Sequence, residues 1–257
     1  NMLEANQIKE NWENFREEIN LQFPTRAKQI NKMYDDFEER IAMMPASSIA
    51  HFHNAFAGGY IDHVLRVMNC THELYNLWSK LGADVSGYTL EELMFAAMHH
   101  DLGKVGFPGD GNEVYQIETS DWHRKNMGRM YKHNENIPFS MVPDLSVWLL
   151  QKYDIAMSWN EYQAIKIHDG MYDDSNKPYF VARSAQAKLK TNMAVILHHG
   201  DHMAAQIEYE RWRNHKAGTP AKVSEKSKAT KSTAIKNLAE NNPGIGSSIA
   251  DIFKDIS

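Results

Sequence analysis

The sequence predicts an all-α fold, and three observations support that class. Apolar residues recur at spacings of three and four along most of the 257 residues, as they do on the buried face of a helix. No stretch shows the strict alternation of apolar and polar residues expected of a half-buried strand. The breaks between the periodic segments carry proline, glycine and serine, which end helices.

The N-terminal segment, residues 1–44, predicts two helices that pack on the core. The first covers residues 2–21 and repeats apolar side chains at helical spacing. Pro24 interrupts this pattern, and a second helix continues to about Met44. The charged residues between the apolar positions are expected to form solvent-exposed faces.

The central segment, residues 45–212, predicts the main domain, since a chain of this length can bury one full core. It opens with Gly58 and Gly59, whose missing β-carbons permit a tight turn, and a helix follows from about Tyr60. Further helices are expected over residues 89–101, 144–153, 160–170 and 187–212.

The helix over residues 89–101 has a clear start and a chemically unusual end. Thr89 is its predicted N-cap and Glu92 the capping-box partner. Its apolar face continues through His100 and Asp101, so two ionisable side chains point inward, where an unpaired charge is costly. A bound divalent cation would remove that cost, because imidazole nitrogen and carboxylate oxygen are common metal ligands.

The C-terminal segment, residues 213–257, differs in composition from the rest. Residues 214–242 are rich in Lys, Ser, Thr and Ala, which predicts a flexible or weakly helical linker. A stripe of isoleucine and phenylalanine then predicts a terminal amphipathic helix. This helix either folds back on its own domain, which is the interpretation we favour, or docks on another protein.

Composition narrows the class of protein. The formal net charge of -5 argues against a surface dedicated to coating nucleic acid. Cys70 is the single cysteine and cannot form an internal disulfide, which favours a reducing compartment. No apolar run approaches the roughly 18 residues that span a bilayer, and the N-terminus lacks a signal-peptide pattern. We therefore expect a soluble, cytoplasmic protein with no membrane partner.

Four residues with side chains that commonly bind metal stand on three separate expected helices, in the order His63, His100-Asp101, Asp201. The flanking motifs are Gly58-Gly59-Tyr60-Ile61-Asp62-His63, His100-Asp101-Leu102-Gly103-Lys104 and Leu197-His198-His199-Gly200-Asp201. With these motifs the chain resembles the HD-domain metal-dependent phosphohydrolases over roughly residues 45–210. A weaker resemblance links residues 45–59 to the HD domain of exoribonucleases that trim 3′ ends. The oligonucleotide-binding barrel of those enzymes has no counterpart in the helical N-terminal segment.

The resemblance implies an HD-domain helical bundle, here with extra N-terminal helices and a C-terminal tail. The implied activity is hydrolysis of a phosphate ester of a nucleotide, another phosphorylated small molecule or a nucleic-acid 3′ end, through a metal-activated water. His63, His100, Asp101 and Asp201 would hold Mn²⁺, Fe²⁺, Co²⁺ or Ni²⁺, with Mg²⁺ a further candidate. Such an ion lowers the pKa of its bound water from 15.7 towards about 7.

Individual roles follow from the same comparison. Asp101 is expected both to ligate the ion and to orient the attacking water, and Lys104 to contact a nonbridging phosphate oxygen. His168 matches a position that holds a second ion in many HD proteins, whereas the other histidine usual there is missing, and His133 is the available substitute. We therefore favour one ion over two, in which case His168 serves as general acid or phosphate ligand.

Several assignments keep alternatives open. The basic side chains of Arg124, Lys125 and Arg129 either bind a phosphorylated substrate or form an ordinary exposed helix face. His51 and His53 either support the site or pack in the core. A di-iron HD-type oxygenase, which requires the second ion, and a catalytically inactive nucleotide-sensing or partner-binding HD module are the competing functions. Self-association is implied by the resemblance, without a stoichiometry.

Overall fold

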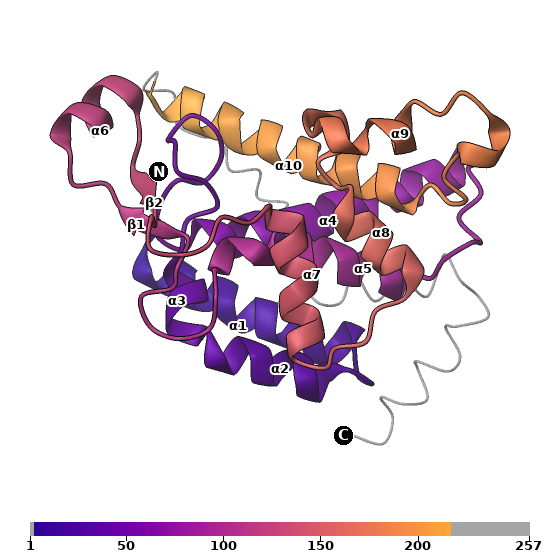
Figure 1. Ribbon diagram of the computed structural model, residues 1–257, viewed down its shortest axis with the longest axis horizontal. Coiled ribbons are helices and arrows are strands. Elements are labelled where there is room, and N and C mark those ends of the chain that lie inside the picture. The colour runs from indigo at the N-terminus through magenta and orange to yellow at the C-terminus, as the bar shows by residue number, and fades with distance from the viewer. Residues whose placement is uncertain (1–2, 217–257) are drawn as a thin grey trace. The chain divides into compact units, whose positions relative to one another are not determined.

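The computed structural model describes residues 3–216, and there the fold is all-α apart from one small two-stranded sheet (Figure 1). The predicted tail lies outside the described residues from residue 217 onward. The α-helices are α1 (Ala5–Gln22), α2 (Ala27–Asp36), α3 (Glu38–Met43), α4 (Gly59–Lys80), α5 (Leu90–His99), α6 (Asp121–Met127), α7 (Val142–Lys152), α8 (Trp159–Lys166), α9 (Lys177–Phe180) and α10 (Met193–Lys216). The strands are β1 (Tyr115–Ile117) and β2 (Tyr131–His133).

Helix α4 runs through the middle of the bundle, with α10 along one side and α1 and α3 along the other (Figure 1). Helix α5 packs against α4 and α8. The close approach of α4 and α10 depends on Gly200, because a β-carbon there would lie 2.1 Å from the hydroxyl oxygen of Thr71 on α4. This contact brings Asp201, the next residue, towards α4.

Two local predictions at helix starts are confirmed. The Thr89 hydroxyl accepts the Glu92 backbone N–H at 3.1 Å, and the Glu92 carboxylate accepts the Thr89 N–H at 2.8 Å, which is the capping box. Gly58 has φ +77° at the N-cap of α4, and a β-carbon on Gly59 would lie 2.1 Å from the Asn54 carbonyl oxygen. The glycine pair therefore forms the tight turn that the sequence predicts.

The first two helices cover α5 through aromatic rings. Tyr34 packs edge-on against Phe15, with ring centroids 4.9 Å apart, and stacks on His99 at 6.0 Å. Arg26, just before α2, lies 2.8 Å from the buried carboxylate of Glu161 on α8. The N-terminal helices are thus in contact with the helix that carries the His-Asp pair.

The secondary structure departs from the prediction in several places. The second helix is broken at Phe37 into α2 and α3, which lets the buried Phe37 ring contact Tyr153 at 6.1 Å. The last helix begins at Met193 rather than at residue 187. The β1–β2 hairpin was not predicted, because strands of three residues are too short to show alternation.

The hairpin is anchored to the loop that precedes α4. The Ala50 backbone N–H donates to the Gly128 carbonyl at 2.9 Å, and the Met130 N–H donates to the Ser48 carbonyl at 2.8 Å. These bonds hold the β1–α6–β2 segment beside the start of α4.

Within residues 3–216, none of the helices combines the length and the apolar character that crossing a membrane would require.

Candidate metal centre

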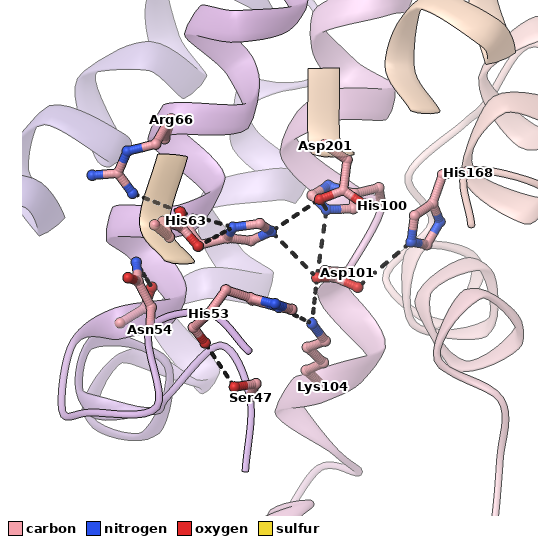
Figure 2. A network of polar contacts seen from close by, with 12 residues as sticks. Ser47, His53, Asn54, His63, Arg66, His100, Asp101, Lys104, His168 and Asp201 are labelled. Carbon is pink, nitrogen blue, oxygen red and sulfur yellow. Dashed lines mark hydrogen bonds and ion pairs between the residues drawn. The ribbon is translucent and has the colours of Figure 1, made fainter. Parts of the chain in front are cut away.

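Five of the predicted site residues converge from different elements (Figure 2). His63 lies on the second turn of α4, His100 and Asp101 directly follow α5, His168 follows α8, and Asp201 lies on α10. All are buried except Asp201, whose side chain keeps 22% of its exposure. The bundle therefore brings together side chains that are as many as 138 positions apart in the sequence (201 − 63).

The ring nitrogens and carboxylate oxygens face one another at short range. His63 Nε2 lies 3.3 Å from Asp201 Oδ1 and 3.7 Å from Asp101 Oδ2. His100 Nε2 lies 3.5 Å from Asp101 Oδ2 and 3.8 Å from Asp201 Oδ1. The other oxygen of Asp101, Oδ1, lies 3.6 Å from His168 Nε2.

The opposite nitrogen of each ring is committed to a hydrogen bond. His100 Nδ1 is 2.8 Å from the Ala97 carbonyl, and His168 Nδ1 is 2.8 Å from the Ile165 carbonyl. Because a carbonyl oxygen can only accept, both Nδ1 atoms carry the hydrogen, and the lone pair of a neutral ring is on Nε2. His63 Nδ1 likewise lies 3.1 Å from both oxygens of Glu208.

This arrangement fits a bound cation. Lone pairs on Nε2 would face carboxylate lone pairs, and within the described residues the buried Nε2 atoms of His63 and His100 have no hydrogen-bond partner. A hydrogen bond from the second ring nitrogen to a carboxylate or carbonyl is the usual support of a metal-ligating histidine. The buried His and Asp groups could therefore hold a metal ion.

The ligand atoms form three overlapping groups of three residues. One combines His63, His100 and Asp201, one combines His100, Asp101 and His168, and one combines His53, His63 and Asp101. Each pair of groups shares one residue, so the described residues do not offer two wholly separate ligand sets. Asp169, whose Oδ1 lies 3.5 Å from His168 Nε2, stands beside the second group.

The charges explain how the group is stable as it stands. Burial opposes the charged form of His63, yet Glu208 and Asp201 raise its pKa to about 10. Burial likewise opposes the charged form of His168, and Asp101 and Asp169 raise its pKa to about 9. Protons on these rings and a bound metal ion would therefore compete for the same cluster.

Lys104 adds a cation at the edge of the group. Its Nζ lies 2.6 Å from Asp101 Oδ2 and 3.5 Å from His53 Nε2. Burial would raise the pKa of Asp101, but Lys104 and His100 hold it well below the usual range. The His53 ring stacks on His63 with centroids 4.8 Å apart, and burial together with Lys104 lowers the His53 pKa to about 3. His53 thus lies in contact with the site as a neutral ring.

Glu208 supports His63 through the Nδ1 side of its ring. No role was predicted for this buried carboxylate from the sequence. Glu208 is 3% exposed and accepts a bond from Arg66 Nη1 at 2.6 Å. Arg66 Nη1 also donates to Asp62 at 2.8 Å, and Asp62 accepts from Asn54 at 2.7 Å (Figure 2). Glu208 stands seven residues after Asp201 on the same face of α10, and that spacing was the available signal.

The other predicted residues do not join the cluster. His133 is exposed at the end of β2, with its ring 5.4 Å from Tyr115, and it is not among the candidate ligand groups of the described residues. Lys125 is exposed on α6. Arg129 pairs with Glu118 at 3.0 Å, and Arg124 lies 3.8 Å from the exposed Asp121.

Comparisons of the chain with protein-family models, curated proteins and solved structures gave no match.

Proposed function

We propose that the chain is a metal-dependent phosphohydrolase that cleaves a phosphate ester of a nucleotide or of a nucleic-acid end. The observation that carries this proposal is the convergence of the Nε2 atoms of His63 and His100 on the carboxylates of Asp101 and Asp201, with Nδ1 of both rings bonded on the far side. Two imidazoles and two carboxylates suit Mn²⁺, Fe²⁺, Co²⁺ or Ni²⁺.

A divalent ion held there would supply hydroxide at neutral pH and offset charge on a phosphoryl oxygen. In this proposal Asp101, whose two oxygens face different rings, orients the nucleophile. Lys104, bonded to Asp101 at 2.6 Å, binds a nonbridging phosphate oxygen. His168, whose Nε2 lies 3.6 Å from Asp101 Oδ1, gives its proton to the leaving oxygen.

The competing functions differ in their metal content. A di-iron oxygenase needs two complete ligand sets, whereas every pair of the three candidate groups among the described residues shares a ligand residue. A binding module needs no metal, and it gives no reason for two buried ring nitrogens and two carboxylates to converge at this point. A single-ion hydrolase accounts for both features.

The test is elemental analysis of the purified protein, followed by a screen for phosphate release from nucleotides and short oligonucleotides in Mn²⁺. We expect about one metal ion per chain and turnover that a chelator abolishes. The variant His63→Ala should lose both metal and turnover. His199→Ala is the matched control, because His199 is an exposed histidine on α10, outside the cluster, and it should retain both.

Other results would redirect the assignment. Two iron atoms per chain, with oxygen consumption and no phosphate release, would favour the oxygenase. Absence of metal and of phosphate release on every substrate would favour the binding module.

A further inference from the structure

A second hollow lies behind the metal centre, on the far side of Glu208. It has a volume of about 420 Å³, within the range of small-molecule sites. Its walls come from the loop before α4, the start of α4, the hairpin segment and the end of α10. His63, His100, Asp101, His168 and Asp201 are not among its lining residues, so it is distinct from the metal centre.

The charged wall of this hollow carries more positive than negative groups. It presents three guanidinium groups, those of Arg66, Arg124 and Arg211, against the carboxylates of Asp62 and Glu208. Both carboxylates already accept bonds from Arg66 Nη1, at 2.8 and 2.6 Å.

Arg211 is an exposed cation of this wall. Within the described part of the chain it forms no ion pair. Burial and the Arg66 guanidinium lower its pKa, and the nearby carboxylates of Asp62 and Glu208 only partly oppose that change. The bonds of Arg66 to described residues leave from Nη1, so Nε and Nη2 still have donors to offer. An anion would satisfy both guanidinium groups at once.

Arg124 adds a third guanidinium from the hairpin segment. Its Nη2 lies 3.8 Å from Asp121, whose side chain is 73% exposed. A pair at this distance and exposure is weak, so Arg124 remains able to bind an anion in the hollow.

The remaining wall is apolar and aromatic. Phe56, Tyr131 and Trp212 line the hollow, together with the aliphatic side chains of Leu3, Ile117 and Met130. The position of Trp212 is supported by contacts with His51 at 6.1 Å and Tyr209 at 5.9 Å between ring centroids. A ligand that matches both walls has an anionic group and a flat, largely apolar part.

We propose that this hollow is a second binding site, for a nucleoside monophosphate, with the phosphate on Arg66, Arg124 and Arg211 and the base against the aromatic wall. Arginine suits phosphate because its planar donors match two phosphate oxygens at once, and bases stack readily on aromatic rings. The site does not require the metal ion, and its existence does not depend on which reaction the metal centre performs.

Calorimetric titration of the full chain with AMP tests the proposal, once with chelator and once with Mn²⁺. We expect binding of one AMP in the presence of chelator, and binding at least about tenfold weaker for adenosine, which lacks the phosphate. Arg211→Ala and Arg124→Ala should each weaken AMP binding about tenfold or more. Arg213→Ala is the matched control, because Arg213 is exposed on the same helix and lies over the Tyr209 ring at 5.9 Å, outside the lining.

Three outcomes would overturn the proposal. The first is AMP binding that appears only with Mn²⁺ and survives both arginine substitutions, which places the nucleotide at the metal centre. The second is the absence of AMP binding at millimolar concentration while circular dichroism shows a folded chain. The third is binding of a short oligonucleotide but not of AMP, which would make the hollow part of a nucleic-acid surface.

Discussion

Two adjacent histidines at the end of α5 project into two different parts of the protein interior, which we call the two interiors. Both are completely buried, and both direct Nδ1 at a helix carbonyl, His99 at Phe95 and His100 at Ala97, each at 2.8 Å. Both have a buried Nε2 without a hydrogen-bond partner among the described residues. By residue type, burial and tautomer the two side chains are the same.

Their surroundings differ in charge. The His99 ring lies 4.3 Å from the Phe95 ring and 6.0 Å from the Tyr34 ring, and within the described residues it forms no pair with a carboxylate. His100 Nε2 has carboxylate oxygens of Asp101 and Asp201 within 3.8 Å. Burial lowers the pKa of His99 to about 3, so that ring is a neutral core residue. A buried, unpartnered imidazole therefore does not mark a metal site; the convergence of carboxylates on it does.

The largest effect should come from replacing one histidine of the pair and not the other. His100→Ala removes an Nε2 ligand, and we expect at least a 100-fold loss of metal affinity, since removal of a supporting residue alone costs about 10–100-fold. His99→Phe keeps an aromatic ring at this position and should leave metal affinity within a factor of about two. Titration of both variants with Mn²⁺ measures the difference, and equal losses would erase the distinction between the two interiors.

The reverse order is expected for stability. His99→Ala empties a ring-sized space between α1, α2 and α5, and we expect a loss of about 3 kcal/mol in the free energy of unfolding, as for other large-to-small core changes. His100→Ala, measured in chelator, should cost less, because it also removes a ring nitrogen without a hydrogen-bond partner. Urea unfolding of both variants provides the comparison, and a smaller loss for His99→Ala contradicts it.

The same contrast shows how far the sequence could lead. The capping box at Thr89 fixes the start of α5, and the apolar stripe after it fixes which side of the helix His100 occupies, so its inward direction was predictable from helical geometry. The gathering of His63, Asp101 and Asp201 around it was expected from motif order, and the structure brings these side chains together.

The remaining features depend on contacts that local sequence patterns do not contain. Glu208 reaches His63 because α10 crosses α4 closely at Gly200. A single amino-acid sequence does not reveal that crossing. The hairpin depends on backbone bonds between residues 48–50 and 128–131, which involve no side-chain pattern. The position of His133 on a strand likewise became visible only through its pairing with Tyr115.

A smaller effect should come from the support behind His63. Glu208→Gln keeps an oxygen that can accept from His63 Nδ1 but removes the charge, and we expect metal affinity to fall about tenfold, the low end for a supporting residue. Glu210→Gln is the matched control, because Glu210 is exposed on the same helix and bonds to Gln206 at 3.1 Å. Equal affinity in both variants would show that the charge of Glu208 does not support His63.

The smallest expected effect is the pH dependence that His99 gives to the free energy of unfolding. The folded-state pKa of His99 is about 3, below its ordinary value of 6.5, so between these values the unfolded chain binds a proton that the folded chain does not. Stability therefore falls as pH drops through 6.5 and levels off near pH 3. At pH 5.5 this contributes a loss of about 1.4 kcal/mol relative to pH 7.5.

Urea unfolding at both pH values, with wild type and His99→Phe compared, isolates this contribution from other titrating groups. The phenylalanine variant should lose about 1.4 kcal/mol less than wild type on acidification, because it has no ring to protonate in the unfolded chain. A pH dependence identical in the two proteins would mean that His99 takes up its proton in the folded state. It would then need an acceptor or counter-ion among the aromatic rings, and the two interiors would no longer differ in the way that makes one of them a candidate metal site.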